Sequence, residues 1–295
     1  MNILITGGAG FIGSNLANKL IELGNKVYVT GKFNIPSDHP NKIQINYGIN
    51  GIDYRRLPTK LDILFHMAAF NDTLSTDEDE MEYINVLASL ELFKKVTQLG
   101  CKKIIYASST AVYGNLINIE AGNTRPLNAY ARSKELLENA ASHFSEDTDI
   151  VTIGLRYCNV YGPNESHKGK RASLIYQMAQ QIRKRPPTLF KFGEQRRDYI
   201  FIDDVVEATI IASQLDSTNV INCGTGQNWS FNEIFEELKM IYRANWTGPK
   251  YIDNPCPELY QNETKCDITR MKALLSFTPR YDLKSGIREY VKRGL

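Results

Sequence analysis

A tyrosine and a lysine stand four residues apart in the segment Tyr130-Ala131-Arg132-Ser133-Lys134. On a helix, side chains at this spacing share one face. A free phenol has a pKa of about 10, which is too high for a base at neutral pH. A nearby ammonium group lowers that pKa because it favours the negatively charged phenolate. The pair therefore predicts a tyrosine that exchanges a proton with a substrate hydroxyl group.

A further hydroxyl group is expected close to this pair. Ser108, Ser109 and Thr110 follow an apolar run that ends at Ala107. Parallel α/β folds bind their ligands at the carboxyl ends of the strands. A serine at this position is suited to hold a substrate alcohol next to Tyr130.

A glycine-rich turn at the start of the chain predicts a cofactor site. It follows the apolar run Asn2–Thr6 and precedes a helical pattern. Its glycines allow a tight turn, a close approach to a pyrophosphate and the packing of helix on strand. The helix N-terminus then presents free N–H groups to the phosphates. The residues expected to bind a dinucleotide here are Gly7, Gly10, Phe11, Ile12 and Gly13.

The end of the second apolar run, Val29-Thr30-Gly31-Lys32, bears on which dinucleotide is bound. An acid usually stands there to bind the adenosine ribose of NAD, and this chain has none. Lys32 is able to pair with a ribose 2′-phosphate. The sequence therefore favours NADP over NAD, with a solvated loop lysine as the alternative interpretation.

The elements that must position these residues follow an alternating pattern. Short β-rich runs alternate with longer helical patterns, which predicts an α/β fold with a doubly wound parallel sheet of the Rossmann kind. The runs expected to form strands are Asn2–Thr6, Lys26–Thr30, Asp62–His66, Lys103–Ala107 and Ile150–Leu155. The clearest helices are expected at Gly13–Leu23, Glu80–Leu99 and Ala129–Phe144.

The second half is less regular and predicts a smaller, interleaved C-terminal α/β substrate lobe. Asp198–Phe201 and Val220–Cys223 are expected to rejoin the sheet as strands, and a helical run, Ala172–Arg185, stops at two prolines. Three further helices are expected at Asn232–Tyr242, Thr269–Leu275 and Leu283–Arg293. The dinucleotide-binding domain is then residues 1–156 plus about 198–223, and the nucleotide-sugar lobe is residues 157–197 plus 224–295.

Composition narrows the class of protein. The chain has 295 residues, 42% hydrophobic and 23% charged, with a formal net charge of +2. This balance does not indicate a nucleic-acid or membrane partner. The five scattered cysteines form no CxxC pair, so we expect reduced thiols and no metal site. The N-terminal sequence does not read as a signal peptide, and the expected location is the cytoplasm.

Together these motifs resemble the extended short-chain dehydrogenase/reductase family. The resemblance rests on residues 6–13, 65–69, 85–86, 108–114, 130, 134, 156–163, 197–198 and 203–204. It implies that Ser109, four residues before Tyr113, is the family serine and that Tyr130 is the acid/base. It also implies that Lys134 holds the nicotinamide ribose and tunes Tyr130. The further cofactor contacts that it implies are at Ala68, Ala69 and Asn85, although Asn85 is better explained as a helix residue that ties together neighbouring backbone.

The resemblance also separates the reactions of this family. Its dehydratases carry an Asp-Glu pair where this chain has Thr110 and Ala111, so dehydration is not expected. The segment from Tyr161 to Ser173 resembles the ADP-glyceromanno-heptose 6-epimerases. In those enzymes a lysine is the second acid/base, and Lys168 matches it. Two opposed proton-transfer groups suit transient oxidation to a ketone followed by reduction from the other face.

The same resemblance provides a set of substrate contacts. Arg197 matches an arginine for the nucleotide phosphates, and Tyr260 matches a substrate-binding tyrosine. The chain departs from the pattern at Lys170, which replaces a small hydroxyl residue, and at Gln177, which replaces a histidine. These departures indicate that the nucleotide or the sugar differs. The residues expected to bind substrate are Ser109, Thr110, Asn159, Lys170, Arg197 and Tyr260.

Three alternatives to such an epimerase stay open at this point. A nucleotide-sugar 4-reductase or dehydrogenase follows if Lys168 is only a surface lysine. A UDP-sugar 4-epimerase is the neighbour within the same reaction class, and a non-catalytic cofactor-binding protein belongs to a different one. The resemblance also implies a homo-oligomer, dimer or larger, with the helices Glu80–Leu99 and Ala129–Phe144 as the candidate interface.

Overall fold

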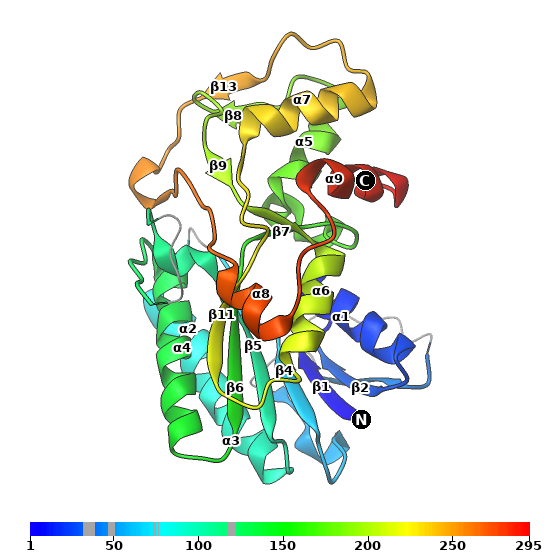
Figure 1. Ribbon diagram of the computed structural model, residues 1–295, viewed down its shortest axis with the longest axis vertical. Coiled ribbons are helices and arrows are strands. Elements are labelled where there is room, and N and C mark those ends of the chain that lie inside the picture. Colours follow the sequence, from blue (N-terminus) through cyan, green and yellow to red (C-terminus); the bar gives the residue numbers. More distant parts are fainter. Residues whose placement is uncertain (32–38, 47–50, 73–74, 76, 117–121) are drawn as a thin grey trace.

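A seven-stranded parallel sheet forms the centre of the fold (Figure 1). The computed structural model describes residues 1–295 except 32–38, 47–50, 73–74, 76 and 117–121. In spatial order the strands are β11 (Asn219–Cys223), β6 (Val151–Tyr157), β5 (Lys103–Ser109), β4 (Ile63–His66), β1 (Asn2–Thr6), β2 (Lys26–Thr30) and β3 (Lys42–Asn46). All neighbouring pairs run parallel. This confirms the predicted doubly wound α/β fold.

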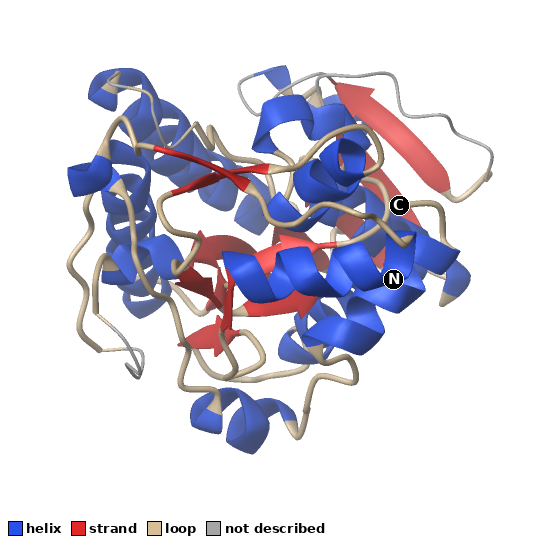
Figure 2. Ribbon diagram, turned by 90° about the horizontal axis from the view of Figure 1, so that it is seen from above, coloured by secondary structure: helices blue, strands red, loops and turns tan. Residues whose placement is uncertain are grey.

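Both faces of the sheet are buried. Along β1, Ile3 and Ile5 belong to one apolar cluster and Leu4 to the other, as expected for side chains that alternate across a strand. Helices α1 (Phe11–Glu22) and α6 (Ile202–Ala212) pack together on one face. Helices α3 (Ala88–Gln98) and α4 (Ala129–Glu146) contribute to the cluster on the other. Seen from above, the strands lie between helices (Figure 2).

The predicted helix Glu80–Leu99 is not one regular helix. It consists of α2 (Glu78–Glu82), a π-helical turn η3 (Tyr83–Leu87) and α3. A π-helical turn inserts an extra residue into an α-helix and is frequent at functional sites. Asn85, one of the predicted cofactor residues, lies in this turn and is buried.

The second half of the chain forms small two-stranded sheets next to helices α5 (Leu174–Ile182), α7 (Phe231–Tyr242) and α9 (Leu283–Lys292) (Figure 1). Helix α8 (Thr269–Leu275) packs against β11 and α6. The pairs are β7 (Asn159–Tyr161) with β10 (Tyr199–Phe201), β9 (Arg196–Arg197) with β12 (Trp229–Ser230), and β8 (Thr188–Phe190) with β13 (Lys250–Ile252). The short helices are η2 (Tyr54–Arg56), η4 (Thr110–Tyr113), η5 (Ser166–Arg171) and η6 (Pro257–Leu259).

The expectation that both later strands rejoin the sheet is correct for only one of them. β11 lies at the edge of the large sheet, beside β6. β10 instead pairs with β7, so the strand expected at Asp198–Phe201 belongs to a separate two-stranded sheet. Every strand of the large sheet falls within residues 2–157 or 219–223. The exact division into two lobes stays a prediction. In the part of the chain that the structure describes, no helix has the length and apolar character to cross a membrane.

Candidate active site

The glycine turn between β1 and α1 has the form that dinucleotide binding requires. Gly7 has φ +67°, a conformation that favours glycine, and a Cβ there would lie 2.8 Å from the Ala68 backbone nitrogen. A Cβ on Gly13 would collide with the Gly7 carbonyl oxygen. Gly10 begins α1 without any side-chain cap, so the first N–H groups of the helix are left for another partner. These residues therefore fit a bound pyrophosphate.

Tyr130 and Lys134 lie in the first turns of α4, as the sequence predicts. Asn128 caps this helix, and its side chain accepts a 2.9 Å hydrogen bond from the Ala131 N–H. Lys134 Nζ lies 5.8 Å from the centre of the Tyr130 ring and donates a 2.8 Å hydrogen bond to the carbonyl oxygen of Ala107. The carbonyl of Ala107 thus fixes the ammonium group beside the phenol.

Burial changes the pKa of both groups. It lowers the pKa of Lys134 to about 8, and the carboxylate of Glu138 opposes this shift. Burial raises the pKa of Tyr130, and a hydrogen bond with the Ser109 hydroxyl opposes it. The sequence predicted a lowered pKa for Tyr130, whereas in the structure the pKa is raised because the phenol is buried.

Asn85 connects the π-helical turn to the start of α4. Its side chain accepts a 2.7 Å hydrogen bond from the Phe70 N–H and donates 2.9 Å bonds to the Phe70 carbonyl and to Ser133 Oγ. Ser133 donates in turn to the Tyr130 carbonyl, at 2.8 Å. The amide is therefore occupied by protein partners. Asn85 positions the helix that carries Tyr130, which agrees with its interpretation as a tie between neighbouring segments.

A cavity of about 620 Å³ opens beside Tyr130. The predicted site residues in its wall are Tyr130, Asn159, Lys168, Lys170, Arg197 and Tyr260. Wall residues that the sequence analysis missed include Phe190, Tyr199, Phe231 and Ile252. Among the described wall residues, Lys168, Lys170, Arg171 and Arg197 are cationic and none is acidic. The charge of the wall therefore suits an anionic ligand.

Lys168 lies on η5 and connects this cavity with the glycine turn. Its Nζ is 5.1 Å from the centre of the Phe11 ring, at the start of α1. Burial lowers the pKa of Lys168, and the carboxylate of Glu165 opposes this. Glu165 is fully buried and accepts hydrogen bonds from the Gly162 N–H and the Ser173 hydroxyl, at 3.2 and 2.8 Å. It therefore holds the loop that presents Lys168 to the cavity.

Arg197 is buried between aromatic rings at another part of the wall. Its guanidinium lies 5.0 Å from the centre of the Tyr260 ring and 5.6 Å from that of Phe231. It donates to the carbonyl oxygens of Arg196, Gln261 and Asn262. No carboxylate pairs with it among the described residues. A buried cation without a carboxylate partner is suited to bind phosphate.

Two of the predicted substrate residues, Ser109 and Thr110, do not line this cavity, and one predicted cofactor residue lies outside the described structure. Ser109 lies at the end of β5 and contacts Tyr130. Thr110 is buried, and its hydroxyl donates to the Tyr157 carbonyl at 3.3 Å, so its side chain is used by the protein. Lys32, on which the preference for NADP depends, lies outside the described residues.

A buried ion pair supports the helix of the catalytic pair. The Arg156 Nε and Nη2 donate to the two carboxylate oxygens of Glu138, at 2.8 and 2.6 Å. Both side chains are 5% exposed. Arg156 also donates a 2.8 Å bond to the Tyr113 hydroxyl. This network joins α4 to β6 and to the turn after β5.

We expect Glu138→Gln to lower the free energy of unfolding by about 3–5 kcal/mol, because it leaves the Arg156 charge buried without a counter-charge. Urea unfolding followed by circular dichroism measures this change. Asp216→Asn is the matched control, since it breaks a 2.8 Å pair with Lys103 in which the aspartate is 92% exposed. The control substitution should lower the free energy of unfolding by less than about 1 kcal/mol. Equal losses in the two variants would contradict the structural role of the buried pair.

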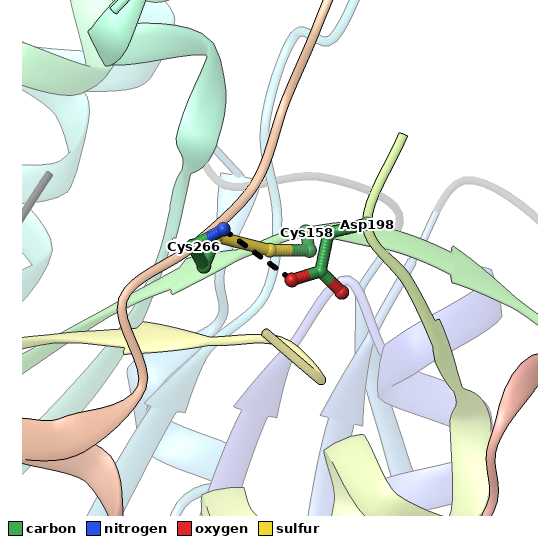
Figure 3. A group of neighbouring side chains, drawn as sticks. All are labelled: Cys158, Asp198 and Cys266. Atoms are coloured by element: carbon green, nitrogen blue, oxygen red, sulfur yellow. Dashed lines mark hydrogen bonds between the residues drawn. A yellow bond between two sulfur atoms is a disulfide. The ribbon is translucent and has the colours of Figure 1, made fainter. Parts of the chain in front are cut away.

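A disulfide joins Cys158, after β6, to Cys266, before α8 (Figure 3). The Asp198 carboxylate lies beside it and accepts from the Cys266 and Gly226 N–H groups, at 3.4 and 2.8 Å. The expectation of five reduced thiols is therefore wrong for these two cysteines, whereas the thiols of Cys101, Cys223 and Cys256 are free. The pairing spans 108 residues, and cysteine spacing alone does not reveal such connectivity. The sulfurs and this carboxylate lie within 4.8 Å of one another, but bonded sulfurs are not thiolate ligands for a metal.

Comparisons with known proteins agree with this geometry. A model of the NAD dependent epimerase/dehydratase family matches residues 3–224. The chain is 32% identical to the ADP-L-glycero-D-manno-heptose-6-epimerase of Brachyspira hyodysenteriae, over 98% of this chain and 96% of that one. The solved structure of the Helicobacter pylori enzyme of that name superposes with a TM-score of 0.87 at 36% identity, over 99% and 96% of the two chains. The structure of a Thermotoga maritima UDP-glucose 4-epimerase with UDP-glucose superposes with a TM-score of 0.89 at 28% identity, over 99% of each chain.

Proposed function

The chain belongs to the NAD dependent epimerase/dehydratase family, and on that basis we propose that it epimerises a nucleotide-sugar. The observation that carries this proposal is that Tyr130 and Lys168, two groups able to transfer protons, line one cationic cavity beside the glycine turn. The similarity to heptose 6-epimerases and UDP-sugar 4-epimerases supports the same reaction class.

The residues of the glycine turn would hold the cofactor. The uncapped start of α1 and residues Gly7, Gly10 and Gly13 form a surface that fits its pyrophosphate. Lys134, fixed by the Ala107 carbonyl, would hold the nicotinamide ribose. When bound, a nicotinamide dinucleotide supplies reversible hydride transfer to and from a sugar carbon.

The protein's own part of the reaction is to move protons and orient the sugar. Tyr130 takes the proton of the sugar hydroxyl that becomes a ketone, while Ser109 orients that oxygen. After the ketone has rotated to present its opposite face, Lys168 donates a proton to the ketone oxygen. The cations of the wall, Arg197 among them, hold the phosphates so that the sugar can turn without leaving the cavity.

Incubation with a panel of ADP-, GDP-, UDP- and dTDP-sugars, followed by NMR, tests the reaction. We expect conversion of one member of the panel into its epimer, without net consumption of cofactor, because the hydride is returned to the same carbon. Stoichiometric consumption of cofactor with no epimer would contradict the proposal. It would establish a reductase or dehydrogenase, which requires only Tyr130 and not Lys168.

NADP is the cofactor that we propose within this class. This proposal is supported by the sequence that follows β2, which contains Lys32 and lacks the acidic residue that usually binds the adenosine ribose of NAD. Lys32→Ala should weaken NADP binding and leave NAD binding unchanged, as titration of each cofactor measures. An unaltered preference for NADP in this variant would contradict the role of Lys32.

We also propose a homo-oligomer, with the cytoplasm as its location. Tyr83 and Leu87 on η3 and Leu136 on α4 are large apolar residues that are 52%, 54% and 41% exposed. Contact between η3 and α4 places these residues on neighbouring elements, which suits an interface between two copies. Light scattering measures the mass, and a monomeric mass would contradict this interface.

A further inference from the structure

The phenol oxygen of Tyr199 is buried and has no hydrogen-bond partner among the residues that the structure describes. The residue is 3% exposed, and it lines the same cavity as Tyr130 and Lys168. Buried polar atoms in folded proteins nearly always have a partner, because an unpaired one destabilises the fold. An unpaired hydroxyl on a residue that lines a ligand cavity is therefore a candidate for a ligand contact.

The backbone places Tyr199 on the same side as Arg197. Side chains two residues apart in an extended segment point to one side, and the residue between them points to the other. The Asp198 carboxylate turns into the protein, where it accepts 2.8 Å hydrogen bonds from the Thr225 and Gly226 N–H groups. Arg197 and Tyr199 both line the cavity, and the charge of Arg197 acts on the Tyr199 phenol.

The chemistry of this part of the wall selects for a negatively charged group. Arg197 is 7% exposed and has no carboxylate partner among the described residues. Burial raises the pKa of Tyr199, so its phenol is a neutral donor rather than an anion at physiological pH. A buried guanidinium and a neutral hydroxyl donor next to each other match the oxygens of a phosphate, which accept several hydrogen bonds.

We propose that Tyr199 donates a hydrogen bond to the diphosphate of the nucleotide-sugar, beside Arg197. This inference rests on the proposed function and adds a substrate-contacting residue to it. Among the described residues, two other buried side-chain oxygens lack a hydrogen-bond partner, Gln195 Oε1 and Glu237 Oε2, but neither residue is in the wall of the cavity. Tyr199 therefore combines an unsatisfied donor with a place in the ligand site.

The test is Tyr199→Phe in the full chain, with ADP and UDP as probes in isothermal titration calorimetry. We expect the variant to bind the diphosphate preferred by the wild type about tenfold more weakly, as for one lost hydrogen bond to a charged group. KM for the nucleotide-sugar should rise by a similar factor with little change in kcat. The melting temperature of the free protein should not fall, because no hydrogen bond within the protein is lost.

Tyr161→Phe is the matched control. Tyr161 is 1% exposed, and its ring lies 6.3 Å from that of Tyr199. Its hydroxyl donates a 3.3 Å bond to the Leu283 carbonyl, and it is not in the cavity wall. We expect this variant to melt at a lower temperature and to bind ADP and UDP as the wild type does. The two phenylalanine variants thus separate a ligand contact from a structural one.

Three results would overturn the inference. Unchanged affinity of Tyr199→Phe for ADP and UDP would mean that water satisfies the phenol. A higher KM with unchanged diphosphate affinity would place the contact on the sugar, and equal weakening of adenosine or uridine binding would place it on the nucleoside. A wild-type protein that binds no nucleoside diphosphate and no nucleotide-sugar would contradict the proposed function itself, so the two failures are distinguishable.

Discussion

Tyr130→Phe is expected to lower kcat by about 10³-fold, within the range that a positioned acid or base contributes. The change removes one oxygen from the wall of the cavity and leaves the ring, the Asn128 cap of α4 and the Lys134–Ala107 bond in place. The variant should therefore fold normally and still bind the dinucleotide. Turnover of the nucleotide-sugar, followed by NMR, measures the loss, and fluorescence titration measures cofactor binding.

Tyr83→Phe is a suitable control, because Tyr83 is 52% exposed and lies outside the cavity wall. It should turn over at the wild-type rate. Wild-type turnover in Tyr130→Phe would contradict the enzymatic role and favour a non-catalytic cofactor-binding protein. The pH dependence gives an independent check. Lys134 has a pKa of about 8, so its ammonium form, which favours the phenolate, is lost as the pH rises through 8. The wild-type kcat/KM, which reports the pKa values of the free enzyme, should decline above that pH.

The sequence was most informative where function depends on local geometry. The bounds of β1 and β2 agree with the predicted runs, because each run is buried on both faces. Tyr130 and Lys134 share a face because a four-residue spacing on a helix requires it. The buried Lys134 also shows the limit of this reasoning. The pKa of Tyr130 depends on how deeply the pair is buried, which no spacing reveals.

The wall of the cavity was harder to predict because it is assembled from distant segments. Phe190 and Ile252 come together only through the pairing of β8 with β13, about sixty residues later in the chain. Neither segment carries a pattern that indicates the other. Tyr199 did have a signal, since it stands two residues after Arg197 in an extended segment. Thr110 was expected to contact substrate, and its burial against the Tyr157 carbonyl arises from packing that the sequence does not record.

Lys168→Met is expected to lower the rate of epimerisation by about 10²-fold, because one of the two proton transfers loses its group. Methionine keeps an unbranched apolar side chain against Phe11 and removes the ammonium. Epimerisation needs one group protonated and the other deprotonated at the start, which gives a bell-shaped pH profile. The limb that belongs to Lys168 should be absent in the variant. Lys170→Met is the control, since Lys170 lies in the same wall but is exposed. It should raise KM and leave kcat nearly unchanged.

The pattern of single turnovers decides whether Lys168 is a true counterpart of Tyr130. If the two groups face opposite sides of the sugar carbon, each variant retains proton transfer to only one epimer. Tyr130→Phe should then form reduced nicotinamide from one epimer, and Lys168→Met from the other, as absorbance measures. If Lys168→Met instead raises KM for both epimers and leaves the rate of nicotinamide reduction at saturation unchanged, the lysine binds phosphate and does not transfer a proton. An epimerisation rate equal to that of the wild type would make it a surface lysine, and a single acid/base at Tyr130 would then have to serve both faces of the ketone.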